Sequence, residues 1–116
     1  MIITLDFETF YGGDYTLKKM TTEEYVRDPR FKIHGIAIKV DAAPAVWYDR
    51  YNPVPAQLWS AIDRSAVLAH HAQFDGLILS HHLDTRPALW LDTLSMARIA
   101  LPHQRHSLDA ICKHLG

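Results

Sequence analysis

The hydrophobic pattern of this chain changes once along its length, and that change limits the folds open to it. Three strand-like segments come first, at residues 1–7, 31–40 and 45–48. From residue 52 onward, apolar residues at helical spacing alternate with short apolar runs. Consecutive strands followed by alternating helices and strands predict a mixed α/β sheet that begins with a three-strand antiparallel meander.

The first two strand-like segments carry further detail. Residues 1–7 are rich in β-branched and apolar residues, so we expect a strand that is apolar on both faces, in the centre of a sheet covered on both sides. In the second segment, the apolar parity switches between Ile33 and Ile36. Gly35 stands at that switch, which predicts a β-bulge.

Helix start and stop signals divide the remainder. Thr21 and Glu24 form a capping box for a short helix that ends near Arg27. Asn52-Pro53 predicts a cap followed by a first helical residue, with the helix running to about Arg64. The later signals predict a strand at 66–70, a helix at 73–83, a strand at 89–91, a helix that Asp92 starts and that runs to Leu101, and a last helix opened by Ser107. Asp92 is interpreted as a helix-starting residue and not as a metal ligand.

Length and composition exclude several classes of protein. The chain has 116 residues, which predicts one small domain, and its 12 basic against 13 acidic residues exclude a strongly basic nucleic-acid clamp. No apolar run is long enough for a membrane span, and the first residues do not form a signal peptide. Cys112 is the single cysteine, so no internal disulfide forms and a reducing, cytoplasmic setting is expected.

The first candidate for chemistry is Asp6-Phe7-Glu8. Residues i and i+2 of a strand point to the same face, so Asp6 and Glu8 lie side by side at the end of an apolar strand. Two close carboxylates repel unless a cation lies between them, and oxygen ligands of this kind suit Mg²⁺ or Mn²⁺. The alternative is that both are strand-end residues facing water.

The second candidate is His71-Ala72-Gln73-Phe74-Asp75, a polar cluster after a buried strand. Asp75 falls in the first turn of the next helix, where a carboxylate is favoured by the helix dipole. Simple helix capping is therefore one reading. The other places Asp75 at the mouth of the sheet, close to the end of the first strand.

These pieces occur in one order: D-F-E-T, then A-H-H-A-Q-F-D, then W-L-D-T-L-S-M-A-R-I-A-L-P and H-S-L-D-A-I-C-K-H-L-G. Together they resemble the proofreading 3′–5′ exonuclease domain of DNA polymerases, the DnaQ-like (DEDD) superfamily, most of all in phage and bacterial family-A-like polymerases. The resemblance covers essentially the whole chain and implies a ribonuclease H-like fold.

The resemblance also implies residue roles. Asp6 and Glu8 match the first exonuclease motif and Asp75 the second, so these three would be catalytic and would bind the two metals, Mg²⁺ or Mn²⁺. Phe7, Thr9 and His71 would contact the substrate. His71 stands where the family usually has asparagine.

One family motif has no counterpart. A fourth carboxylate, four residues after a tyrosine or histidine, would follow the helix that ends this sequence; His106 and Asp109 are spaced by three and come too early. We therefore expect residues 1–116 to be the N-terminal part of an exonuclease domain, truncated at its C-terminus, that holds one metal weakly and the second poorly. Expected partners are a single-stranded DNA 3′ end or a nucleoside monophosphate, the rest of a polymerase chain, and a second copy bound through exposed apolar surface.

Alternatives remain beside this hypothesis. The chain could be a non-catalytic nucleic-acid- or nucleotide-binding module, or an exonuclease of the same superfamily directed at RNA. The eight histidines do not favour zinc, because neighbouring histidines on a strand point to opposite faces. The three tryptophans, Trp47, Trp59 and Trp90, are interpreted as core or half-buried packing residues, with base-stacking platforms as the alternative.

Overall fold

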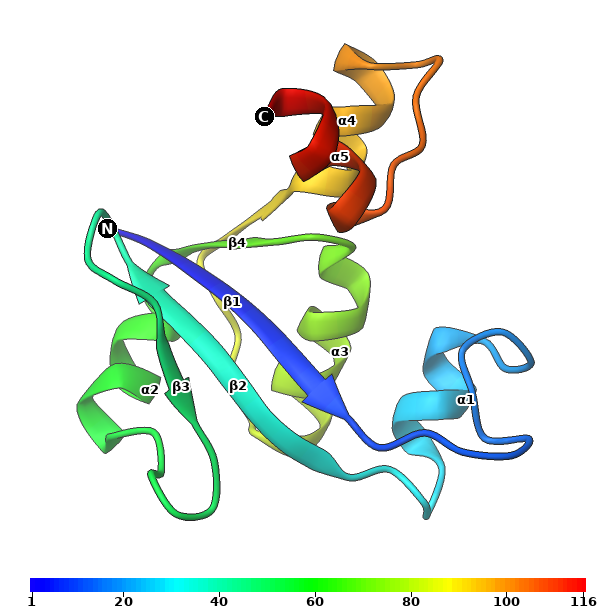
Figure 1. Cartoon of the computed structure of the whole chain (residues 1–116). Coiled ribbons are helices and arrows are strands. Elements are labelled where there is room, and N and C mark those ends of the chain that lie inside the picture. Colours follow the sequence, from blue (N-terminus) through cyan, green and yellow to red (C-terminus); the bar gives the residue numbers. More distant parts are fainter.

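The protein is a single mixed sheet with helices packed on one of its faces (Figure 1). The computed structural model describes residues 1–116. Its strands are β1 (Ile2–Thr9), β2 (Ile33–Val40), β3 (Val46–Tyr48), β4 (Ala66–Ala69) and β5 (Leu89–Asp92). The helices are α1 (Thr22–Arg27), α2 (Ala56–Ile62), α3 (Ala72–His82), α4 (Thr93–Ala100) and α5 (Leu108–Leu115). No helix has the length and apolar character needed to cross a bilayer.

The strand order is β3-β2-β1-β4-β5, with β1 in the centre. β1 runs antiparallel to β2, and β2 runs antiparallel to β3, which confirms the predicted meander. β1 is parallel to β4, and β4 is parallel to β5, as helical crossovers require. The predicted α/β, ribonuclease H-like sheet is therefore confirmed.

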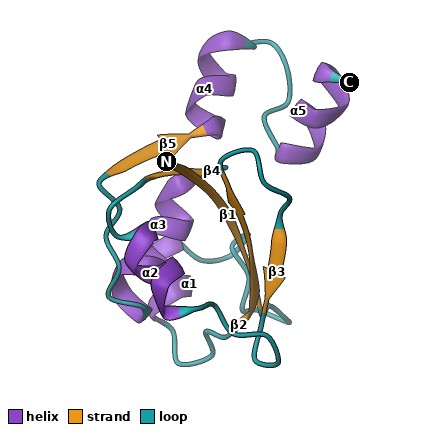
Figure 2. Ribbon diagram, turned by 90° about the vertical axis from the view of Figure 1, so that its left-hand side faces the viewer, coloured by secondary structure: helices purple, strands orange, loops and turns teal.

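One face of the sheet holds the hydrophobic core. Ile3, Leu5 and Phe7 of β1 are buried there, and Ile78 and Leu79 of α3 pack against them. Figure 2 shows α2 and α3 on the same side of the sheet. The alternation of buried and exposed residues along β1 follows directly from the two-residue period of a strand.

The opposite face of β1 is open, which makes the prediction of a sheet covered on both sides wrong. Ile2 is 46% exposed, and Asp6 and Glu8 are exposed as well. Buried and exposed residues alternate along β1, but the exposed ones become acidic only at the end of the strand. The apolar start of the chain therefore concealed the alternation. Figure 2 shows α4 and α5 beyond the end of the sheet rather than across this face.

Three of the predicted helix caps are confirmed by side-chain hydrogen bonds. The side chains of Thr21, Asp92 and Ser107 accept from Glu24 N, Leu94 N and Ala110 N at the starts of α1, α4 and α5. Apart from α2, the predicted boundaries lie within one or two residues of the observed ones.

The predicted start of α2 is wrong. The helix begins at Ala56, after Pro55, and not at Pro53. Asn52 is engaged elsewhere, because its backbone N donates to Asp49 and its side chain donates to the carbonyl oxygen of Trp47. Asn52 thus belongs to a turn between β3 and α2, and it does not cap α2 as the sequence pattern predicts.

Gly35 lies at the predicted bulge, since the register shifts where Glu8 pairs with Gly35 and Thr9 with Ile33. A Cβ atom on Gly35 would lie 2.1 Å from a ring carbon of Trp47 and 2.7 Å from the carbonyl oxygen of Tyr48. We expect Gly35→Ala to lower the free energy of unfolding by about 1–3 kcal/mol through overpacking. Urea unfolding tests this, with Gly12→Ala, which meets only ordinary contacts, as the control. Equal stability of both variants would contradict it.

Candidate active site

The site is built on the second half of β1. β1 pairs with β4 only at Ile2, Ile3 and Thr4, while its pairing with β2 continues to Thr9. Asp6 and Glu8 lie on this protruding half and point to the open face. The sequence-predicted pair therefore shares one face and is accessible.

Asp75 reaches the same part of β1 from the other side. It lies in the first turn of α3, directly after β4, and is 1% exposed. Its Oδ1 accepts a hydrogen bond of 3.3 Å from the backbone N of Phe7, the residue between Asp6 and Glu8. Asp75 is thus hydrogen-bonded to β1, and helix capping alone does not describe its place in the fold.

The electrostatics of these carboxyl groups agree with their closeness. Burial raises the pKa of Asp75 to about 7, and the negative charge of Asp6 adds to the rise. Partial burial also raises the pKa of Asp6, while nearby His70 opposes that rise. Removal of water and repulsion between carboxylates both favour a bound proton or a bound cation.

His70, the residue after β4, ties the end of this strand to the C-terminal segment. Its Nε2 lies 2.7 Å from the carbonyl oxygen of His106, and its Nδ1 lies 2.9 Å from the Thr93 hydroxyl oxygen. A carbonyl only accepts, so Nε2 carries a proton. The sequence hypothesis overlooked this residue, although its place at the end of a buried strand was a usable signal.

His71 is fixed by its backbone. It adopts a left-handed conformation, with φ of 65°, immediately before α3. Its backbone N donates to Asp92 Oδ1 at 3.0 Å, and the same carboxylate oxygen caps α4 by accepting from Leu94 N. Burial would raise the pKa of Asp92, but the backbone donors outweigh it and hold the pKa below its ordinary value. Asp92 is therefore a structural carboxylate, as the sequence predicts.

Thr9, at the end of β1, is held by Tyr25 of α1. The Tyr25 hydroxyl donates to the carbonyl oxygen of Phe10, and the Thr9 hydroxyl oxygen lies 2.8 Å from it. Because the single Tyr25 hydroxyl proton goes to Phe10, Thr9 is the donor in the second bond. The ring of Tyr25 stacks on that of buried Tyr15, with centroids 4.5 Å apart.

A cavity of about 350 Å³ opens beside this network. Phe7, Glu8 and Thr9 line it together with Phe74, and Lys18 supplies a positive charge at its wall. Three of the six sequence-predicted site residues therefore meet at one hollow. Its mixture of apolar and charged walls suits a small polar molecule with an apolar part.

Tyr25 is a positioning residue that the sequence hypothesis did not single out. We expect Tyr25→Phe to lower the free energy of unfolding by about 1–2 kcal/mol, because the Phe10 carbonyl and the Thr9 hydroxyl lose their partner. Thermal or urea unfolding measures the change. The control is Tyr11→Phe, since Tyr11 is 73% exposed. If both variants unfold alike, the Tyr25 hydroxyl does not stabilise the segment at Thr9 and Phe10.

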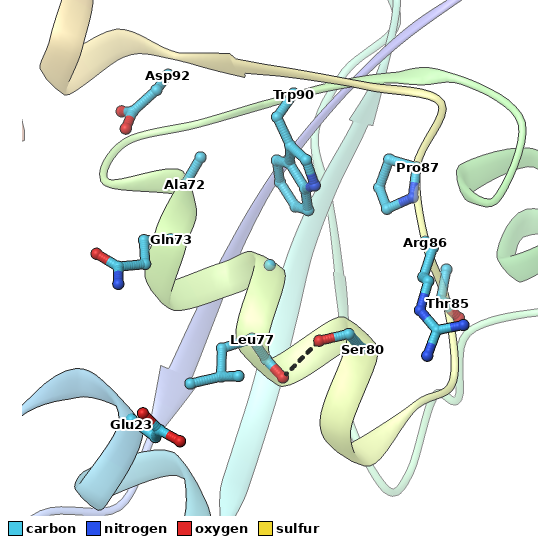
Figure 3. A pocket seen from close by; sticks show the side chains of 11 residues that line it. Glu23, Ala72, Gln73, Leu77, Ser80, Thr85, Arg86, Pro87, Trp90 and Asp92 are labelled. Carbon is cyan, nitrogen blue, oxygen red and sulfur yellow. Dashed lines mark hydrogen bonds between the residues drawn. The ribbon is translucent and has the colours of Figure 1, made fainter.

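The largest cavity lies elsewhere. It measures about 690 Å³ and lies between α3 and the segment from Thr85 to Asp92 (Figure 3). Trp90 projects into it and packs beside Gly76, while Arg86 and Glu23 lie at its rim. None of the six sequence-predicted residues lines this cavity, so size alone does not locate the site.

Comparisons with known proteins agree with this geometry. No family model matches the chain. DNA polymerase III subunit epsilon of Pasteurella multocida (strain Pm70) is 34% identical over 93 residues, which are 73% of this chain and 35% of that protein. Brucella melitensis NrnC with bound Mg²⁺ superposes with a TM-score of 0.69 at 21% identity, over 98% of this chain and 52% of that one. Escherichia coli RNase D, an exoribonuclease involved in structured RNA processing, superposes with a TM-score of 0.66 at 15% identity, over 99% and 28%.

The chain has a DnaQ-like (DEDD) exonuclease domain fold. The fold that the resemblance implied is thereby confirmed. The chain spans about a third of the curated relative and about half of NrnC. What the complete proteins do is therefore carried over to this chain only as a proposal.

The fit of a divalent cation to this DEDD fold can be judged from the donor set. Asp6, Glu8 and Asp75 offer the hard oxygen ligands that Mg²⁺ and Mn²⁺ prefer, and two of them have a raised pKa. The structure does not gather three or more acidic, histidine or cysteine side chains into a ready cage. The donor chemistry therefore fits, with Asp6 and Glu8 exposed and Asp75 turned toward the β1 backbone.

Proposed function

We propose that the chain is a metal-dependent 3′–5′ exonuclease domain that hydrolyses phosphodiester bonds at the 3′ end of single-stranded nucleic acid. One observation carries the proposal: buried Asp75 is hydrogen-bonded to the strand residue that separates exposed Asp6 and Glu8. This contact holds Asp75 against the strand that carries Asp6 and Glu8, although Phe7 and Asp75 are 68 positions apart in the sequence. Two paired carboxylates with a third beside them are suited to cations that act on phosphates.

Within this proposal, Asp6 and Glu8 would hold the cation, Mg²⁺ or Mn²⁺. Asp75 would add negative charge from the core side of β1. A bound divalent cation stabilises the charge that develops on the reacting oxygens and lowers the pKa of the attacking water. Phe7 and Thr9 would orient the terminal nucleotide in the cavity that they line, and His71 would contact it from the start of α3.

The proposed substrate is the 3′ end of single-stranded DNA, and the proposed setting is proofreading within a larger DNA polymerase. The curated relative named as a subunit of DNA polymerase III supports this reading. Residues 1–116 would then be the N-terminal part of the exonuclease domain. The family-A-like context and the phage origin stay predictions.

A second candidate is an exonuclease directed at RNA or short oligonucleotides. NrnC was solved bound to pGG, and RNase D is named as an exoribonuclease, and both share this fold. The two candidates differ in the sugar that the site accepts. A non-catalytic binding module is the outcome in which neither substrate is cleaved.

The test is a time course with single strands of DNA and of RNA of identical sequence, each labelled at its 5′ end. With Mn²⁺ the proposal predicts a ladder of products shortened from the 3′ end, faster for DNA, and no products in excess chelator. The ladder should form slowly, because residues 1–116 are expected to hold the second metal poorly. Faster cleavage of RNA would favour the second candidate. Binding without cleavage of either strand would leave a non-catalytic module.

A further inference from the structure

Trp47 lies on the same sheet face as the two exposed carboxylates. In β3, Trp47 pairs with Ala37 of β2, and Ala37 pairs in turn with Asp6 of β1. Directly paired residues of neighbouring strands point to the same face, so these three side chains form one row on the open face. Strand spacing puts the two ends of such a row roughly 10 Å apart.

The indole ring leans from this row toward Glu8. Glu8 pairs with Gly35, and the point where a Gly35 Cβ would stand lies 2.1 and 2.5 Å from two carbons of the Trp47 six-membered ring. The ring therefore occupies the space above Gly35, one strand away from Glu8. Only a residue without a side chain at position 35 allows this placement.

The ring is held in place from its other end. The Trp47 Nε1 donates to Asp49 Oδ2 at 3.0 Å. The other oxygen of Asp49 accepts from the backbone N atoms of Tyr51 and Asn52. A ring fixed before binding loses little conformational freedom when a ligand stacks on it.

The three tryptophans differ in their surroundings. Trp59 and Trp90 are partly buried and pack against the hydrophobic core, as their sequence positions predict. Trp47 is 44% exposed and lies outside that core. Trp47 is therefore half-buried: its ring packs over Gly35 and not against the core, and part of it faces solvent.

We propose that Trp47 is a stacking platform for a nucleobase of the single strand whose 3′ end enters the Asp6–Glu8 site. Aromatic rings that bind single strands stack on bases whatever the sequence. This chain carries 12 basic and 13 acidic residues, so it has no overall positive charge to attract phosphates. A stacking ring would add affinity that the net charge does not supply. The proposal rests on the proposed function and adds a residue from β3 to it.

The test measures binding of a 5′-fluorescein single-stranded DNA oligonucleotide by anisotropy, in Ca²⁺ to suppress hydrolysis. We expect Trp47→Leu, which keeps apolar bulk but loses the aromatic face, to weaken binding roughly ten-fold. Trp47→Phe should lose far less. The matched control is Val46→Ala, because Val46 is 43% exposed on the same strand and points to the other face.

A second arm separates stacking from an effect on the fold. The oligonucleotide carries one abasic site, moved stepwise from the 3′ end. The proposal predicts one position at which wild type and Trp47→Leu bind equally, because the base that stacks is already absent. A difference that persists at every position, or no difference with any strand, overturns the proposal. The proposal is also overturned if a second copy of the chain or another protein covers Trp47.

The two proposals fail in different ways. If the wild type shortens single strands and Asp6→Asn abolishes this, while Trp47→Leu binds as the wild type does, only the stacking proposal is wrong. If the wild-type chain neither binds nor shortens single strands, both are wrong. Thermal unfolding of Trp47→Leu and Val46→Ala shows whether either variant has lost its fold.

Discussion

Replacement of Asp6 by asparagine should lower the rate of 3′-end hydrolysis by more than ~100-fold. Loss of groups that only orient metal ligands typically costs 10- to 100-fold, so loss of a proposed ligand should cost more. Stability should not fall, since Asp6 is exposed and its charge opposes ionisation of Asp75. The measurement is single-turnover cleavage of a 5′-labelled strand in Mn²⁺, together with urea unfolding.

The matched control is Asp84→Asn. Asp84 is an exposed aspartate away from the site, and its φ of 46° is one that asparagine tolerates. This variant should cleave at the wild-type rate. A fully active Asp6→Asn protein, or an equal loss in both variants, would remove Asp6 from the proposed site.

The second large effect is on stability and concerns Asp75. In the folded protein, burial and then the charge of Asp6 raise its pKa from 3.8 to about 7. Between these two values the folded state keeps a proton that the unfolded state has lost. Stability therefore falls as pH rises from about 4 to 7, by up to ~4 kcal/mol, and is level above that range.

Asp75→Asn should remove this slope. The amide oxygen can still accept from Phe7 N, and no charge is buried, so the variant should be several kcal/mol more stable than the wild type at pH 8 and about equal at pH 4. Urea unfolding in chelator at both pH values measures this. Three other carboxyl groups, those of Asp28, Asp49 and Asp92, have a lowered pKa. They make stability fall as pH decreases, and only at pH values below the ordinary pKa of an aspartate. An unchanged slope in Asp75→Asn would show that Asp75 is charged in the fold.

The parts of the fold that depend on local chemistry could be predicted from the sequence. Caps at Thr21, Asp92 and Ser107 need only a short side chain and a free amide a few residues on, so the pattern locates them. Asp6 and Glu8 share a face because a strand has a period of two residues. For the same reason, Gly35 reveals the bulge through a change of apolar parity.

Other features depend on contacts between distant segments. The bond from Phe7 N to Asp75 follows from the place where β4 stops pairing with β1, which no local pattern contains. Trp47 reaches the carboxylate face only through the register of β3 on β2 and the lack of a side chain at Gly35. The open face of β1 was concealed because Ile2 and Thr4 precede the acidic residues on it.

The most direct test of the central claim, that Asp6, Glu8 and Asp75 form one cation site, is a Mn²⁺ titration followed by electron paramagnetic resonance of the free ion. It needs no substrate and no turnover. The account predicts saturable binding to the wild type that is weakened at least ~10-fold in Asp6→Asn, Glu8→Gln and Asp75→Asn, and unchanged in Asp84→Asn. Equal Mn²⁺ binding by all five proteins would contradict it.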